Sequence, residues 1–347
     1  MKNGGFRPYD NDAGWGMMRF MRHLVFRLLS ICGMVSLLRC VHKNSLTVIL
    51  YHGIAPKDEG SGMYNYRRKF IDPAHFEKQL AYLKAHYTIL PLEEALSLMW
   101  KKELPPAALA ITFDDGYENN FLHAFPILKR AELSATFFVT TDFVFGRKPL
   151  WVDRLEYACG AGDTPRGEKE KKDDVLRNEM KKFSPEERED RLAELETKER
   201  ALTNFEGERR VYAPLSEAQM KEMARGGMSI GAHTQTHPIL SRILPEEARS
   251  EIALSKLALE QHGFAVSPIF AYPNGQPGDW NERTEEAAAE IGFTAALTTV
   301  QGVNTHTTHQ FRLKRIALDG TDDDLYTFAA IVASMRLYLS QLKHVFV

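Results

Sequence analysis

The chain has 347 residues, of which 44% are apolar and 26% are charged, and its formal net charge is -2. This is the composition of a folded protein with ample material for a core, and the absence of a basic stripe argues against nucleic-acid binding. The cysteines, Cys32, Cys40 and Cys159, form neither a Cys-x-x-Cys pair nor a disulfide framework, and the sequence contains no Gly-rich phosphate loop.

The first feature along the chain is a basic apolar stretch at residues 17–40. It is interrupted by charged residues such as Arg19, Arg22 and Arg27. It is too short and too charged for a membrane span, which needs about 20 apolar residues, and it lacks a signal-peptide cleavage site. We therefore predict a basic amphipathic helix on a membrane surface, at the cell envelope or on a cytoplasmic face. The alternative is an ordinary helix packed on the protein. We separate residues 1–44 from a main domain, 45–347.

From Ser45 onward, short apolar runs alternate with segments of helical periodicity. Runs of β-branched and apolar residues predict strands, and the segments between them predict helices. Such alternation is typical of a mostly parallel sheet with helices outside it. The predicted strands are 45–51, 108–113, 134–139, 228–232, 269–275 with its turn, 295–298 and 311–318. The predicted helices are 72–87, 92–99, 121–130, one capped by Ser216 and Gln219, 245–262, 284–291 and 324–346.

A charged segment interrupts this alternation at roughly 160–210. It is dense in Lys, Glu, Arg and Asp and has few apolar positions. We predict a solvated helical insertion at about 154–214, arranged as a helical pair over one edge of the domain and without chemistry of its own. Trp151 and Asp153 lie where it begins. They either line a sugar subsite or serve as a hydrophobic anchor and a helix cap, and the sequence favours neither.

Two adjacent carboxylates, Asp114 and Asp115, stand where the strand 108–113 ends. Like charges this close raise each other's pKa, so the pair needs a nearby cation or a proton on one member. The alternative is an Asp-Gly turn in which one aspartate caps the following helix. The sequence around the pair does not by itself distinguish the turn from a site.

His233 and His237 follow another predicted strand, and they change this balance. An isolated His-x-x-x-His pair usually binds nothing. Together with Asp115, however, the two imidazoles make an oxygen and nitrogen donor set suited to a divalent transition metal. Strand ends at one face of a parallel sheet are where sites form. Asp114 would then be free as a general base for metal-assisted hydrolysis, with a backbone N–H of the turn 273–275 as oxyanion donor.

The segments 112–116 (TFDDG) and 233–237 (HTQTH) resemble the first two motifs of the polysaccharide deacetylases, the NodB-like family of carbohydrate esterases (carbohydrate esterase family 4). The segments 50–52, 270–275 and 312–316 resemble further segments common in that family. The resemblance spans about 45–320, apart from the insertion. It implies an α/β fold, a distorted (β/α) barrel that usually lacks one strand of the eightfold form. It also implies a hydrolase that removes N-acetyl or O-acetyl groups from a polysaccharide or glycoconjugate and releases acetate.

The resemblance further implies a metal on Asp115, His233 and His237, with zinc as the first choice and cobalt, nickel or manganese as alternatives. It makes Asp114 the general base. The family usually places an arginine two residues before the proline of its third motif, where it orients the base, but this chain has an alanine there. We take Arg315 as the substitute. Ala271 is therefore one departure from the family pattern, and Thr299 is the other.

In much of the family, a histidine two residues after a leucine is the general acid, and this chain has Thr299 at that place. His52, at the end of the first predicted strand, is our choice for this role, because strand ends position side chains better than loops do. His306 and His309 are the alternatives, and a further possibility is that no side chain acts as acid. The predicted substrate contacts are Tyr272, Asn274 and Trp151.

Two other functions remain open from the sequence. The missing arginine and histidine leave room for a catalytically silent carbohydrate-binding protein of the same fold, whereas the intact Asp114, Asp115, His233 and His237 argue against it. The second is a metal-dependent amidohydrolase that acts on a small non-sugar amide.

Overall fold

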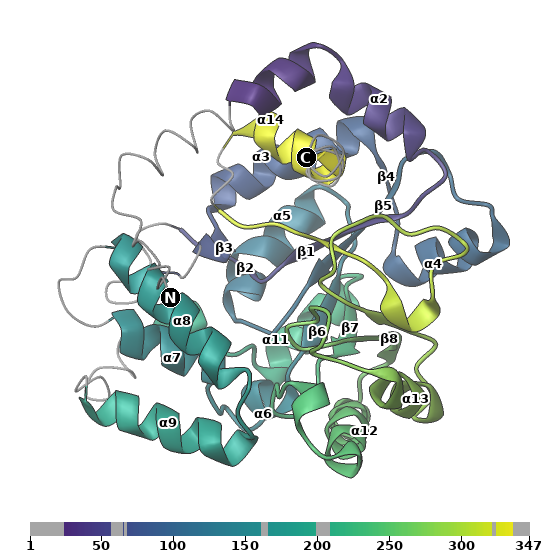
Figure 1. The fold of residues 1–347 in the computed structure, drawn as a ribbon. Coiled ribbons are helices and arrows are strands. Elements are labelled where there is room, and N and C mark those ends of the chain that lie inside the picture. The colour runs from purple at the N-terminus through teal and green to yellow at the C-terminus, as the bar shows by residue number, and fades with distance from the viewer. Residues whose placement is uncertain are drawn as a thin grey trace, which may run out of the picture.

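The computed structural model describes residues 24–56, 65, 68–160, 166–198, 209–320 and 324–335 (Figure 1). The first part of the basic stretch, before residue 24, and the end of the predicted terminal helix, after residue 335, lie outside these residues.

A curled parallel sheet forms the centre of the fold. Its strands run in the order β10-β1-β5-β6-β7-β8-β9, a further strand, β4, pairs with β5, and every pairing is parallel. The central strands are apolar and buried on both faces, as expected of a sheet covered by helices. The predicted fold class is therefore confirmed. The strands are β1 (Thr47–Tyr51), β4 (Thr88–Ile89), β5 (Ala108–Phe113), β6 (Thr136–Val139), β7 (Ser229–Ala232), β8 (Val266–Ala271), β9 (Ala295–Leu297) and β10 (Ile316–Ala317). A separate small sheet consists of β2 (Gly53–Ile54) and β3 (Phe70–Ile71).

The segment before β10 connects the two edges of the curled sheet. The N–H of Leu313 donates to the carbonyl of Ala296 in β9, the strand at one edge of the sheet, at 3.0 Å. Ile316 pairs instead with Ile49 of β1, near the opposite edge. Because the chain crosses here from one edge to the other, the predicted strand 311–318 is wrong as a continuous element. It is a 3-10 turn, η6 (Gln310–Arg312), followed by a two-residue strand. The crossing leaves Arg315 fully buried between the edges.

Helices surround the sheet much as the periodicity predicts. Ser216 and Gln219 form the predicted capping box. The helix predicted at 121–130 instead begins with a π-helical turn, since Pro126 has no N–H to continue the α-helical bonds. These elements are α3 (Pro73–His86), α4 (Leu92–Lys101), η2 (Asn120–Ala124), α5 (Phe125–Arg130), α6 (Thr141–Val144), α11 (Glu217–Arg225), η5 (Leu240–Arg242), α12 (Pro245–Gln261) and α13 (Glu282–Glu290).

The insertion contains three helices and a short 3-10 turn within its described residues, rather than the predicted helical pair. These are α7 (Trp151–Gly160), α8 (Arg166–Met180), α9 (Pro185–Lys198) and η4 (Arg209–Tyr212). The helices stand together at one side of the sheet (Figure 1). Three apolar residues of the charged segment, Met180, Leu192 and Leu195, are buried and join the main core, in helices that contact α7. The insertion is thus packed onto the domain.

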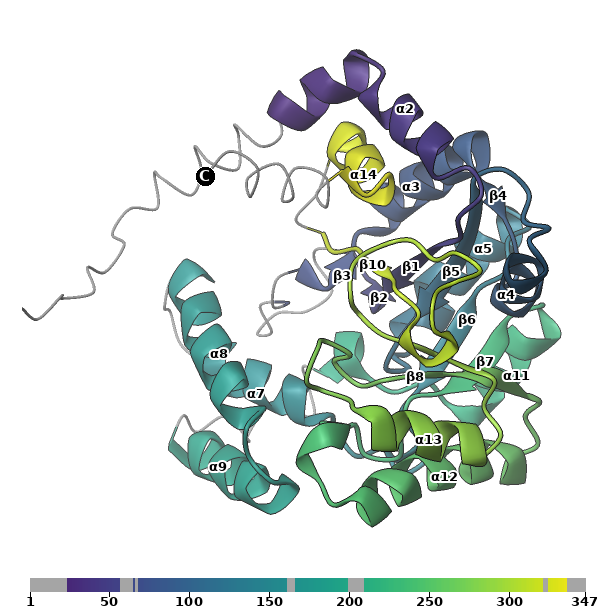
Figure 2. The same ribbon diagram turned by 45° about the vertical axis from the view of Figure 1, so that its right-hand side comes forward.

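The two ends of the described chain pack on each other. The helices Leu24–Ile31 and α2 (Met34–Val41) are bent by 72° around Gly33, which has a left-handed backbone, so the predicted stretch 17–40 is not one continuous helix. Their buried side chains cover α14 (Leu325–Val332), which itself lies on α3 (Figure 2). Helix α14 is buried on almost every side, so the prediction of an amphipathic terminal helix is wrong for this part. Among the described helices, none alone has the length and apolar character of a membrane span, although the bent pair together has both.

Candidate active site

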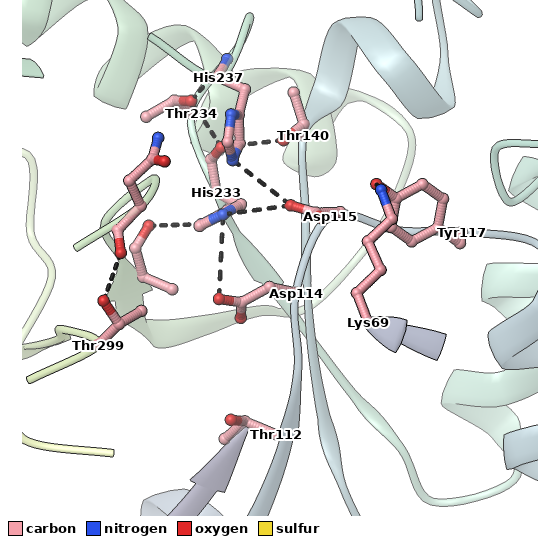
Figure 3. A network of polar contacts seen from close by, with 12 residues as sticks. Lys69, Thr112, Asp114, Asp115, Tyr117, Thr140, His233, Thr234, His237 and Thr299 are labelled. Carbon is pink, nitrogen blue, oxygen red and sulfur yellow. Dashed lines mark hydrogen bonds and ion pairs between the residues drawn. The ribbon is translucent and has the colours of Figure 1, made fainter. Parts of the chain in front are cut away.

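The acidic pair and the two histidines meet at the carboxyl ends of β5 and β7, the strands on either side of β6 (Figure 3). Asp114 and Asp115 follow β5 directly, His233 follows β7, and His237 lies in the loop after it. One donor atom from each of Asp115, His233 and His237 lies within 4.8 Å of the others, and all three residues are buried. The structure therefore assembles the three predicted ligand residues in one place.

The tautomer of His233 suits a metal ligand. Its Nδ1 lies 2.7 Å from the carbonyl oxygen of Ala271, which can only accept, so Nδ1 carries the proton and Nε2 is left with a lone pair. That Nε2 lies 3.6 Å from Oδ1 of Asp115, and Nε2 of His237 lies 3.4 Å from the same oxygen. Burial lowers the pKa of His233 to about 4, so the ring is neutral at neutral pH, as a metal ligand must be.

Asp115 is ionised despite its burial. Desolvation alone would raise its pKa, but the hydrogen bond with His237 and the charges that His237, His52 and His233 carry when protonated together outweigh that effect and hold the pKa well below its usual range. One carboxylate and two imidazoles, all buried and directed at one point, fit a divalent transition metal such as zinc.

The two loops that carry the ligands have strained backbones. Asp115, Thr234 and His237 have φ angles of 77°, 65° and 64°, in the left-handed region that costs a non-glycine residue roughly 1–2 kcal/mol. Thr234 stabilises its loop by accepting the N–H of His237 on its hydroxyl at 3.0 Å. The backbone N–H of Thr140 donates to the carbonyl of Asp115 at 3.1 Å. The strained backbone at these positions is maintained because hydrogen bonds of this kind fix it.

Two supporting residues were not predicted from the sequence. Besides its bond to Asp115, Thr140 donates its hydroxyl to the carbonyl of His233. Glu251 of α12 accepts the backbone N–H groups of Gln235 and Thr236 at 2.9 and 2.8 Å. Thr140 is a polar residue at the end of β6, between the two ligand-bearing strands, and that position could have indicated it. Glu251 is one acidic residue among many on a helix, and no sequence pattern singles it out.

Arg315 and Asp114 form a buried, two-pronged ion pair. The guanidinium Nη1 and Nη2 donate to Oδ1 and Oδ2 of Asp114 at 2.8 and 2.7 Å, while Nε donates to the carbonyl of Thr298. Such a charge-assisted fork fixes the carboxylate plane. At Ala271, where the family pattern expects arginine, the side chain is a methyl group. The structure thus places Arg315 on the predicted base, although its role in catalysis stays a prediction.

His52 lies at the end of β1, half-buried beside the acidic pair. Burial lowers its pKa, and the charges of Asp115 and Asp114 oppose that effect, so the ring is close enough to sense both carboxylates. The two alternatives for the acid, His306 and His309, are exposed, and His309 is engaged with the N–H of Phe311. The position of His52 beside the acidic pair, and the exposed positions of His306 and His309, keep His52 as the preferred candidate.

Two residues predicted as substrate contacts, Tyr272 and Trp151, have buried side chains. Tyr272 has no exposed surface and its ring stacks on Trp280, so it contributes packing instead of a substrate contact. Trp151 is also buried: its indole N–H donates to the carbonyl of His237 at 3.1 Å, and the guanidinium of Arg188 lies 4.7 Å from the ring. A ring covered in this way cannot stack on a sugar. For Trp151, the structure supports the alternative of an anchor.

The turn after β8 offers fewer free donors than predicted. Pro273 has no N–H, and the N–H of Gly275 bonds to the carbonyl of Pro273 at 2.6 Å. This leaves the N–H of Asn274 as the candidate oxyanion donor of the turn. Asn274 is half-buried, its carbonyl accepts the hydroxyl of Thr299, and its side-chain Nδ2 has no hydrogen-bond partner among the described residues. Its predicted contact with substrate stays a prediction.

Comparison with known proteins identifies the family. The family model for polysaccharide deacetylase matches residues 101–296, more than half of the chain. The protein belongs to the polysaccharide deacetylase family. Its enzyme class is therefore that of a hydrolase that removes acetyl groups, as the motifs predicted.

Relatives and solved structures agree with this assignment. YxkH of Bacillus subtilis, whose name places it in the same family, is 24% identical over 294 residues, 84% of this chain and 77% of the relative. A poly-beta-1,6-N-acetyl-D-glucosamine N-deacetylase of Staphylococcus epidermidis is 30% identical over 110 residues, 29% of this chain and 38% of that protein. The deacetylase PplD of Streptococcus pyogenes has a TM-score of 0.54 at 22% identity, covering 80% of this chain and 94% of PplD. IcaB of Ammonifex degensii also has a TM-score of 0.54 at 22% identity, covering 83% and 97%. These structures share the fold.

Replacing Arg315 by methionine should destabilise the protein by about 3–5 kcal/mol, because it leaves the buried Asp114 carboxylate without its cation. The double variant Asp114→Asn, Arg315→Met removes both charges and should recover part of that loss. Chemical denaturation of the metal-free proteins measures the free energy of unfolding. Equal loss in the single Arg315 variant and the double variant would show that the ion pair is not the source of the effect.

Proposed function

We propose that this deacetylase hydrolyses N-acetyl groups on N-acetylglucosamine units of a polysaccharide, with a divalent metal held by Asp115, His233 and His237. The observation that carries the proposal is the buried donor set of one carboxylate and two imidazoles beside a second, separately held carboxylate. The name of the Staphylococcus epidermidis relative supports N-acetylglucosamine as the sugar. Zinc is the first candidate metal.

A bound divalent metal would polarise the acetyl carbonyl and lower the pKa of the attacking water. Asp114 then takes the proton from that water. Its Oδ2 lies 4.0 Å from Nε2 of His233, so the base stands beside the donor set, and the fork from Arg315 holds its carboxylate in one plane. The N–H of Asn274 is the candidate donor to the developing oxyanion.

The chief test is acetate release from N-acetylglucosamine oligomers, including the β-1,6-linked polymer, with and without chelator and re-added zinc or cobalt. Asp114→Asn should keep the metal and lose turnover, whereas His237→Ala should lose the metal. Metal-bound protein that releases no acetate from any substrate would instead support a silent carbohydrate binder. Faster hydrolysis of small amides than of oligosaccharides would support an amidohydrolase.

His52 is proposed as the general acid that protonates the leaving nitrogen. Replacing it by glutamine should slow turnover by roughly 10²–10⁴-fold and leave metal content unchanged. A general acid must be protonated to act, so the wild-type kcat should fall as the pH rises through the pKa of His52. Burial lowers that pKa, so the fall should occur at a lower pH than for an exposed histidine. A His52→Gln enzyme with the same pH profile as the wild type would assign the acid elsewhere.

We also propose that the protein works at an anionic membrane surface of the cell envelope. No aspartate or glutamate occurs between Asp12 and Asp58, so this part of the chain carries positive charge only. Its helix pair exposes large apolar side chains, including Leu28, Ile31 and Leu37 at 53%, 64% and 56% exposure. Exposed apolar residues together with basic ones are typical of a helix lying in a membrane interface.

The triple variant Leu28→Ser, Ile31→Ser, Leu37→Ser should reduce binding to phosphatidylglycerol-containing vesicles at least about tenfold, because it removes exposed apolar area without touching the buried face. Co-sedimentation measures the bound fraction, with phosphatidylcholine vesicles for comparison. The matched control is Leu254→Ser, Leu257→Ser on α12, where the leucines are 44% and 45% exposed. Wild-type protein that binds neither kind of vesicle would refute the proposal.

A further inference from the structure

The first helix of the insertion contacts both loops that carry the metal-ligand residues. At its start, the indole N–H of Trp151 donates to the backbone carbonyl of His237 at 3.1 Å. Two residues later, the carboxylate of Asp153 accepts the hydroxyl of Tyr117 at 2.9 Å. Tyr117 lies two residues after Asp115 (Figure 3). One turn of α7 is therefore bonded to the two loops whose relative position determines the donor set.

These contacts act where the backbone needs support. Asp115 and His237 both have left-handed φ angles, which a non-glycine residue adopts at a cost. A hydrogen bond to the carbonyl of His237 fixes the peptide plane that follows the residue, and with it the direction of the imidazole. The bond comes from an indole that is rigid and buried, so it is directional and is not exchanged with water.

The indole of Trp151, which is the donor in this hydrogen bond, is itself fixed by other residues of the insertion. Arg188 covers the ring of Trp151, and its guanidinium donates to the backbone carbonyls of Met180 and Phe183, in and after α8. All three described helices of the insertion thus contribute to the position of one indole, because Trp151 belongs to α7, Met180 to α8 and Arg188 to α9.

The other contact of α7 is fixed by buried charge. The ammonium of Lys69 lies 2.5 Å from Oδ1 of Asp153 and 3.1 Å from Oε2 of Glu156, one turn further along α7. The hydroxyl of Tyr212, in the last part of the insertion, also donates to Glu156. Both carboxylates are almost wholly buried, so a shift of the helix would separate charges that water cannot reach.

We infer that Trp151 is a positioning residue for the metal centre, so that the insertion, through α7, sets how tightly the donor set binds its metal. This inference deepens the proposed function and rests on it, because it concerns the same donor set. In this role, Trp151 acts through the backbone of His237 and is not itself a metal ligand.

The test compares Trp151→Phe with Trp280→Phe. Both changes remove one indole N–H and keep an aromatic ring, but Nε1 of Trp280 has no hydrogen-bond partner among the described residues, so that change breaks no known bond. Zinc affinity is measured by competition with a chromophoric chelator, and cobalt binding by its visible absorption spectrum. Melting of the metal-free proteins measures the fold independently. Because one hydrogen bond is worth about 1 kcal/mol, Trp151→Phe should weaken zinc binding about fivefold and alter the cobalt spectrum, while Trp280→Phe should do neither.

Tyr117→Phe examines the second contact and keeps the test informative if Trp151→Phe folds poorly. It retains the ring, loses the hydroxyl bond to Asp153, and should also weaken zinc binding. Metal affinities of the folded Trp151 and Tyr117 variants that equal those of the wild type and of Trp280→Phe would overturn the inference, even if both variants melt at lower temperature. Wild-type protein that binds neither zinc nor cobalt would instead refute the proposed metal centre itself.

Discussion

The ion pair between Asp114 and Arg315 makes it possible to bury two adjacent carboxylates at the end of β5. Asp114 and Asp115 are 3% and 4% exposed, so neither can rely on water to stabilise its charge. They are served by different partners: Arg315 binds both oxygens of Asp114, whereas Asp115 is directed at His233 and His237. This separation of environments is what allows neighbouring carboxylates to take different parts in one reaction. A buried pair of this kind is weak evidence for added stability, and its value lies in orientation.

That pair in turn depends on how the sheet is completed. Arg315 and Asp114 are 201 residues apart in the chain and meet because residues 313–317 cross between the two edges of the sheet. The ligand loops depend on further elements: β6 contributes Thr140, α12 contributes Glu251, and α7 contributes Trp151. The donor set is therefore held by supports from most of the fold, which is how the strained backbones of Asp115 and His237 can be maintained.

The sequence predicted those parts of the site that local chemistry determines. Strand ends followed by Asp-Asp and His-x-x-x-His indicated four residues that the structure brings together, and the alternation of strands and helices predicted the parallel sheet.

Side-chain direction was not predictable in the same way. Tyr272 and Trp151 are aromatic residues next to the motifs, and only tertiary packing shows that one is buried under Trp280 and the other is turned toward His237. The segment leading into the crossing, 311–314 (FRLK), alternates apolar and basic residues as a strand does, and only the contacts of Leu313 with β9 show the crossing.

The two departures from the family pattern have different consequences in the structure. Ala271 has no guanidinium to offer, but its backbone carbonyl fixes the tautomer of His233. The positive charge beside Asp114 comes from Arg315, which lies on another element. The missing arginine therefore gives little support to a silent protein. At Thr299, the hydroxyl bonds to the carbonyl of Asn274, and Gln276 donates to Thr299, so this corner ties two loops together. A proton donor must then come from elsewhere, and His52 senses the acidic pair from the end of β1. The contact with Asp114 that residue 271 lacks is thus made by Arg315, whereas the acid role that we propose for His52 answers the departure at Thr299.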